Sequence, residues 1–138
     1  MNITVIANEA PTHQWSVEGF GRFWKNPQNP EIILPVIWPQ IAGYWPRAQQ
    51  PLRGKEAYLQ GIIDFLAAVP HFSAKVADYA FNGDCVFVRW VATGKPIVGP
   101  ECLTGVDRMI LKDGFVLENR IHSDHPIFAH LAQTRTLG

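Results

Sequence analysis

The chain has 138 residues, of which 47% are hydrophobic and 17% charged, and this predicts one globular domain, residues 1–138. Its 12 basic and 12 acidic side chains cancel, so no basic stripe favours nucleic acid as a partner. No apolar run reaches the about 18 residues of a membrane span and no secretory signal pattern opens the chain, so we expect a cytoplasmic protein that does not contact a membrane.

The first predicted element is a helix over residues 14–25. Its aromatic side chains recur at helical spacing and are Trp15, Phe20, Phe23 and Trp24. The pair Asn26-Pro27 ends this run, because the residue before a proline is disfavoured in helical conformation. Pro30 then begins a second, short helix in the segment PEIILPVI, and Pro35 interrupts it.

A short strand is predicted over residues 41–45, and the loop PRAQQPLRG follows it. The clearest helix of the sequence covers residues 55–69, and Pro70 ends it. Its apolar side chains form one wide stripe and are Tyr58, Leu59, Ile62, Ile63, Phe65, Leu66 and Val69.

After Pro70 the hydrophobic period changes from about 3.6 residues to 2. Turn signals at 82–84, 94–100 and 113–114 divide this part of the chain. The predicted strands are 73–81, 85–93, 102–111 and 115–122. We expect an antiparallel meander with the helices against one face, which is an α+β domain, and one further helical turn over residues 127–132.

The two cysteines are predicted to be reduced thiols. Cys85 and Cys102 lie near opposite ends of neighbouring predicted strands, so their side chains should not face one another.

Three segments follow one another along the chain: PLRGKEAYLQGIIDFL, NGDCVFVRWVATG and GVDRMILKDGFVLENR. Together they resemble the nuclear transport factor 2-like superfamily, in particular its SnoaL-like polyketide cyclase and ketosteroid isomerase branches, with a core over about residues 14–128. The resemblance implies a cone-shaped, strongly curved antiparallel sheet that wraps around N-terminal helices and encloses an apolar pocket. It implies no single function, because this fold hosts isomerases, cyclases, dehydratases, epoxide hydrolases and non-catalytic binders.

Strand alternation predicts which side chains face the pocket. If Trp90 faces it, Val88 does too, and Phe87, Arg89 and Val91 point outward. The residues expected to contact a small apolar ligand are Trp24, Trp45, Val88, Trp90, Met109, Asn119 and Ile121. Five tryptophans would equally suit a filled core, so the sequence leaves both interpretations open.

Asp107 is the candidate acid, because it falls where the ketosteroid isomerases carry a neutral, proton-donating aspartic acid. A carboxyl in an apolar cavity has a raised pKa and can donate a hydrogen bond to a developing oxyanion. The alternative is an aspartate paired with Arg89 or Arg108, or solvated at a strand edge.

The resemblance also implies where the isomerases, epoxide hydrolases and cyclases of this superfamily carry a base or a water-activating acid. In this chain those positions hold Trp45, Trp90, Ala92 and Ile121 instead. The base is therefore unidentified, and Tyr44 or a histidine is the candidate. The segment IHSDHP lacks further residues at metal-ligand spacing, so we expect no metal and no cofactor.

Two functions follow. One is an isomerase, cyclase or dehydratase that acts by proton transfer; the other is a non-catalytic domain that binds or senses an apolar ligand. The resemblance also implies a homodimer through the outer sheet face, where apolar and arginine side chains are expected together.

Overall fold

The structure is a computed structural model that describes residues 9–137, with side chains described as far as Thr134. Its elements are α2 (Val17–Lys25), the 3₁₀ helix η1 (Pro30–Val36), β1 (Ile37–Tyr44), β2 (Leu52–Arg53), α3 (Lys55–Ala68), β3 (Ser73–Asn82), β4 (Cys85–Thr93), β5 (Cys102–Lys112), β6 (Phe115–His122) and α4 (Pro126–Leu137).

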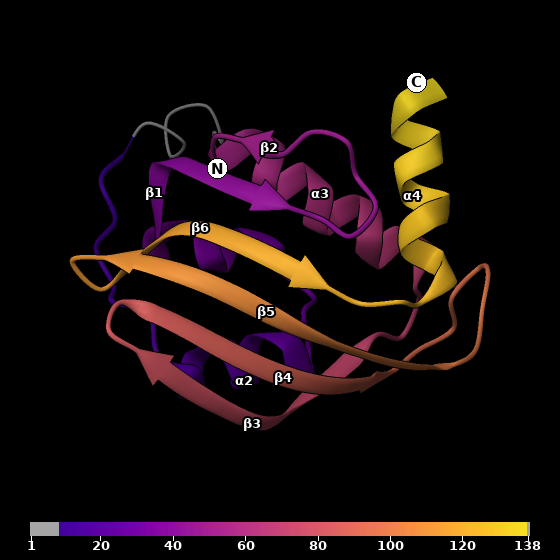
Figure 1. Cartoon of the computed structure of the whole chain (residues 1–138), viewed down its shortest axis with the longest axis horizontal. Helices are drawn as coiled ribbons and strands as arrows, with labels where there is room; N and C mark the ends of the chain where they lie inside the picture. Colours follow the sequence, from indigo (N-terminus) through magenta and orange to yellow (C-terminus); the bar gives the residue numbers. More distant parts are fainter. Residues whose placement is uncertain (1–8, 138) are drawn as a thin grey trace.

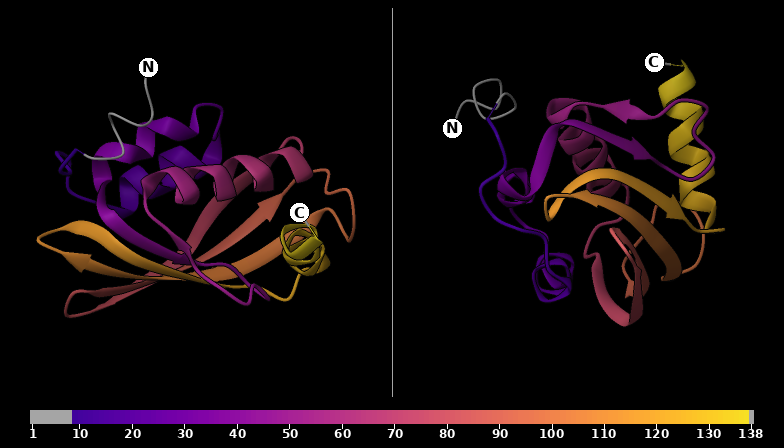
Figure 2. Two further views of the ribbon diagram at one scale, coloured as in Figure 1. Left: turned by 90° about the horizontal axis from the view of Figure 1, so that it is seen from above. Right: turned by 60° about the vertical axis from the view of Figure 1, so that its left-hand side comes forward.

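Six strands form one curved sheet in the order β2-β1-β6-β5-β4-β3 (Figure 1). Strands β3 to β6 pair antiparallel in sequence order, as the meander requires. The helices α2, η1 and α3 cover one face of this sheet, and α4 stands beside its end (Figure 2). The predicted α+β cone, a curved sheet that wraps around N-terminal helices, is confirmed.

The four predicted strands agree with β3 to β6 to within one residue at each end. The predicted alternation on β4 is also confirmed: Val86, Val88 and Trp90 are buried, whereas Phe87 and Arg89 are exposed. This alternation fixes the inner face of the sheet, and the helices pack on that face.

The edge of the sheet differs from the sequence prediction. β1 begins at Ile37 rather than residue 41, and it pairs parallel with β6, which a meander does not include. Its register shifts between Ile37 and Ala42, around Pro39, whose nitrogen cannot donate to the ladder. The expected loop contains the short strand β2, which pairs with β1.

Local chemistry explains where α2 and α3 begin. α2 begins after Ser16, whose Oγ accepts a hydrogen bond from the backbone N–H of Gly19 at 3.0 Å. α3 begins after Gly54, whose φ of 91° is open to glycine. α4 is longer than the single turn predicted.

The cysteines lie as predicted. Cys85 pairs in register with Ile110 and Cys102 with Thr93, at opposite ends of the same two strands, and both thiols are free.

Within residues 9–137, no helix is both long and apolar enough to cross a bilayer.

Candidate functional site

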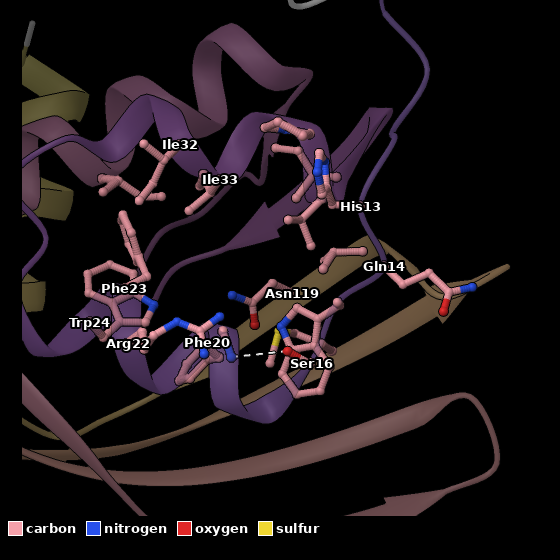
Figure 3. Close-up of a pocket in the computed structure, with 18 of the residues that line it drawn as sticks. His13, Gln14, Ser16, Phe20, Arg22, Phe23, Trp24, Ile32, Ile33 and Asn119 are labelled. Atoms are coloured by element: carbon pink, nitrogen blue, oxygen red, sulfur yellow. Dashed lines mark hydrogen bonds between the residues drawn. The ribbon is translucent and has the colours of Figure 1, made fainter.

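A cavity of about 600 Å³ lies between the helices and the inner face of the sheet (Figure 3). Most of its wall is apolar, from Trp15, Phe20, Phe23, Trp24, Ile32, Ile33, Val36, Ile37, Ile62, Met109 and Val116. Its polar side chains are His13, Gln14, Ser16, Arg22, Asn26, Tyr58 and Asn119. A mainly apolar wall with few polar groups is typical of a small-molecule site.

A second, smaller hollow of about 30 Å³ shares the aromatic wall of Phe20 and Trp24 with the first. Its other walls are Trp45, Phe65, Phe72, Ala74, Trp90, Asp107, Ile121 and Phe128. The carboxyl of Asp107 therefore belongs to the small hollow, whereas Tyr58 and Asn119 belong to the large cavity.

The side chains predicted to contact one ligand are thus divided between two hollows. Trp24 lines both, Met109 and Asn119 line the large cavity, and Trp45, Trp90 and Ile121 line the small one. Val88 lines neither, because it is fully buried in the hydrophobic core on the inner face of the sheet.

Asp107 lies in the middle of β5, between Val88 of β4 and Ile121 of β6, with 5% of its surface exposed. Trp90 Nε1 donates a hydrogen bond to its Oδ1 at 2.9 Å, and Asn119 Nδ2 donates one to its Oδ2 at 3.0 Å. The two arginines considered as its partners form other ion pairs. Arg89 pairs with Asp78, and Arg108 pairs with Glu118. The carboxyl is therefore buried without a salt bridge.

Burial raises the pKa of Asp107 from 3.8 to about 6, although the hydrogen bonds from Asn119 and Trp90 and the charge of His122 oppose the rise. The expected increase in the pKa is therefore present. A pKa of about 6 leaves roughly one molecule in ten neutral at pH 7, so the ionised carboxylate predominates there.

Asn119 connects this carboxylate to the large cavity. Its Nδ2 donates to Tyr58 Oη at 3.0 Å as well as to Asp107. Burial raises the pKa of Tyr58 well above its ordinary value, so the phenol stays neutral. Because Tyr58 Oη accepts from Asn119, the phenol can still donate its own hydrogen, which has no acceptor within residues 9–137.

Asn119 Oδ1 is also buried, and it has no hydrogen-bond partner among the described residues. Tyr58, whose hydroxyl hydrogen is uncommitted, and Asn119 both line the large cavity, whereas the Asn119 carbonyl oxygen itself lies beneath the surface of the wall. A carbonyl oxygen on a bound molecule could accept a hydrogen bond from the Tyr58 hydroxyl.

Sequence reasoning missed Tyr58, which it placed in the apolar stripe of the helix over 55–69. The available signal was chemical: a phenol among leucine and isoleucine side chains needs a hydrogen-bond partner when it is buried. Tyr44, the tyrosine proposed as a base, is elsewhere. It pairs in register with Arg120 on the outer face, and that guanidinium lies 3.8 Å from its ring centroid. This position gives no support to Tyr44 as the base.

Among the described histidines, His13 alone lines the large cavity. His125 is held in place by two bonds: its Nε2 donates to Pro100 O at 2.7 Å, and its Nδ1 accepts from the backbone N–H of Ile127 at 3.0 Å. His122 is exposed. Across the part of the chain that the structure describes, no three His, Cys, Asp or Glu side chains are grouped to hold a metal ion.

A curved sheet, covering helices and an apolar cavity with a few polar groups together define a small-molecule-binding fold of the isomerase and cyclase type. The sequence profile of the SnoaL-like polyketide cyclase family matches residues 16–101. The chain belongs to this family, within the nuclear transport factor 2-like superfamily. No curated protein matches the sequence.

Solved structures show the same fold. A candidate SnoaL-like polyketide cyclase from Jannaschia sp. aligns over 82% of this chain and 92% of its own, with a TM-score of 0.67 and 19% identity. A candidate polyketide cyclase from Bacillus cereus aligns over 83% of this chain and 75% of its own, with a TM-score of 0.64 and 21% identity. IdmH, a candidate polyketide cyclase from Streptomyces antibioticus, aligns over 86% and 95%, with a TM-score of 0.63 and 22% identity.

Proposed function

We propose that this protein binds a small apolar ketone in the large cavity and promotes transfer of a proton from the carbon next to the carbonyl group. The observation that carries the proposal is the hydrogen-bonded series Asp107–Asn119–Tyr58, which ends on the cavity wall with a neutral phenol whose hydrogen is uncommitted within the described residues. Isomerases and cyclases of this fold type need such a donor where negative charge develops on oxygen.

Each residue in the series has a distinct task. The Tyr58 hydroxyl donates to the ketone oxygen and stabilises the enolate that forms when the neighbouring carbon loses its proton. Asn119 holds the Tyr58 oxygen through Nδ2, so the phenol hydrogen is left free to be donated to a bound ketone. Asp107 does not line the large cavity. It is a positioning residue here, because its carboxylate fixes the orientation of the Asn119 amide.

We assign the base to His13, because it is the one described histidine in the cavity wall. Its Nδ1 lies 2.9 Å from Thr12 Oγ1, and in the tautomer in which Nδ1 donates to this hydroxyl oxygen the other ring nitrogen is available to take the proton. The segment that carries it is held by the backbone, since the N–H groups of Thr12 and His13 both donate to Pro35 O, at 2.8 and 3.1 Å.

Deuterium exchange tests this proposal without knowledge of the natural substrate. The probe is 2-tetralone, an apolar ketone with exchangeable hydrogens next to its carbonyl group, followed by NMR in D₂O. The wild type should accelerate exchange, and Tyr58→Phe should lower the rate constant by about 100-fold, because one oxyanion donor is removed. His13→Gln should lower the rate constant with little change in tetralone affinity.

Tyr79→Phe is the matched control, since it makes the same change on an exposed tyrosine outside the cavity. Exchange at the rate of buffer alone, with tetralone shown to be bound, would remove the proton-transfer proposal. An equal loss of rate in both tyrosine variants would remove the specific role of Tyr58.

A second candidate function is non-catalytic binding of an apolar ligand. It is favoured by one observation: among the described residues, no aspartate or glutamate lines the large cavity. Tetralone binding without acceleration of exchange would select this candidate.

For assembly, we retain the homodimer through the outer face of the sheet as a proposal. Phe87 on this face is 40% exposed, and Arg89 lies beside it on β4. An exposed aromatic residue among arginines is the composition expected of a protein interface.

A further inference from the structure

We infer that the molecule bound in the large cavity carries a negatively charged group, which Arg22 binds at the mouth. The inference rests on the proposed function, since it requires the cavity to be a ligand site, and it extends that function by naming the charge of the ligand. The ligand class is an apolar keto acid, which is a ketone of the proposed kind that also carries a carboxylate.

The first step is the position of the Arg22 side chain. Arg22 lies in the last turn of α2, is exposed, and lines the cavity. Its guanidinium is folded back over the helix: Nη2 lies 3.8 Å from the point where a Cβ on Gly19 would be. Gly19 and Ser16 line the same cavity, and in Figure 3 the Arg22 side chain is drawn among the other cavity residues. The charge is therefore held on the cavity side of α2.

The second step is the absence of a counter-charge. Glu18 lies four residues before Arg22, the spacing at which helical ion pairs form, yet within the described residues the two make no ion pair. Arg22 is the one lysine or arginine among the described residues of the cavity wall, and no described aspartate or glutamate is present there. The mouth of an apolar cavity thus carries one cation without an anion beside it.

The third step is the chemistry that this arrangement recognises. A guanidinium presents several N–H donors in a plane and binds a carboxylate through two parallel hydrogen bonds. Both an apolar acid and its neutral analogue can place their rings against the aromatic wall of Phe20, Phe23 and Trp24, but only the acid gains a charge pair with Arg22. The cavity therefore discriminates between an acid and its neutral analogue of equal shape.

Paired probes of the same size test the inference: 2-naphthoate and 2-naphthamide, titrated into the full chain at pH 7.5 and followed by tryptophan fluorescence. The wild type should bind the acid about fivefold more tightly than the amide, which is the scale of an ion pair in contact with solvent. Arg22→Gln should abolish this preference and leave the affinity for 2-naphthamide unchanged. Added salt should reduce the wild-type preference, because the pair is exposed.

Lys25→Gln is the matched control. It removes one positive charge from the same helical turn, but Lys25 does not line the cavity, so the preference should survive. The inference is overturned if the wild type binds both probes equally, if Lys25→Gln loses as much preference as Arg22→Gln, or if Arg22→Gln weakens both probes alike. Binding of the amide without preference for the acid removes this inference alone; failure of both probes to bind removes the proposed function as well.

Discussion

Replacing Asp107 with asparagine removes a buried negative charge and keeps the shape of the side chain. The perturbation acts on stability through the raised pKa of this carboxyl, which is about 6 in the folded protein compared with 3.8 for the free group. The folded protein holds this proton more tightly than the unfolded chain does. The contribution of Asp107 to the free energy of unfolding is therefore fully present below about pH 3.8 and is lost as the pH rises through 6.

The magnitude follows from this difference. About two pKa units at 1.36 kcal/mol each give a loss of about 3 kcal/mol between pH 4 and pH 7. Asp107→Asn has no such titration. Relative to the wild type it should therefore gain about 3 kcal/mol in free energy of unfolding as the pH rises over this range. All other titrating groups are common to both proteins and cancel in the difference.

Urea unfolding at a series of pH values between 4 and 8 measures this difference, with Asp78→Asn as the control. Asp78 is an exposed partner of Arg89, so its substitution should show no comparable rise. If the difference between wild type and Asp107→Asn is independent of pH, Asp107 has no raised pKa and the reasoning about its burial is wrong.

The same substitution should also weaken catalysis by reorienting Asn119. A new amide at position 107 would offer an N–H to Asn119 where the carboxylate accepted one, so the Asn119 amide should turn and present its oxygen. Tyr58 would then donate to Asn119 rather than into the cavity. Exchange of 2-tetralone should fall even though Asp107 does not line the cavity.

Other predictions concern the surroundings of this network and the outer face. Trp90→Phe removes one donor to the carboxylate and should raise the pKa of Asp107 further, measured by carbon NMR of the carboxyl; an unchanged pKa would contradict the 2.9 Å bond. Gly105→Ala would place a methyl group against the Trp90 indole and 2.7 Å from the His122 carbonyl oxygen, so it should lower the free energy of unfolding by about 2 kcal/mol in urea titrations; a neutral effect would refute this packing. Phe87→Asp should convert a dimer to a monomer by light scattering, and a wild type that is already monomeric at micromolar concentration would rule the dimer out.

The sequence was sufficient for most of the fold because period-2 alternation and turn residues are local signals. They located β3 to β6 and the inner face of β4, but they left open whether Asp107 is buried or solvated at a strand edge. The parallel pairing of β1 with β6 could not be predicted in this way, because it joins segments distant in sequence and passes a proline. Only the three-dimensional arrangement brings Ile37 opposite Val116.

The site was predicted less completely, since a site depends on which side chains converge from different elements. Alternation placed Asn119 on the inner face, but not its bonds to Tyr58 and Asp107, whose partners come from α3 and β5. The division of the predicted walls between two hollows depends on how the aromatic side chains of α2 pack. Spacing along the chain carries no information about that packing.

The carbonyl stretch of bound 2-tetralone tests most directly whether Tyr58 donates a hydrogen bond into the cavity. Infrared difference spectra of the complex should show the carbonyl band at lower frequency than in an apolar solvent, because a hydrogen bond weakens the C=O bond. In Tyr58→Phe the band should return toward the apolar value, and in Tyr79→Phe it should keep its wild-type position. A band in the wild-type complex at the apolar value, with the ketone bound, would contradict the account.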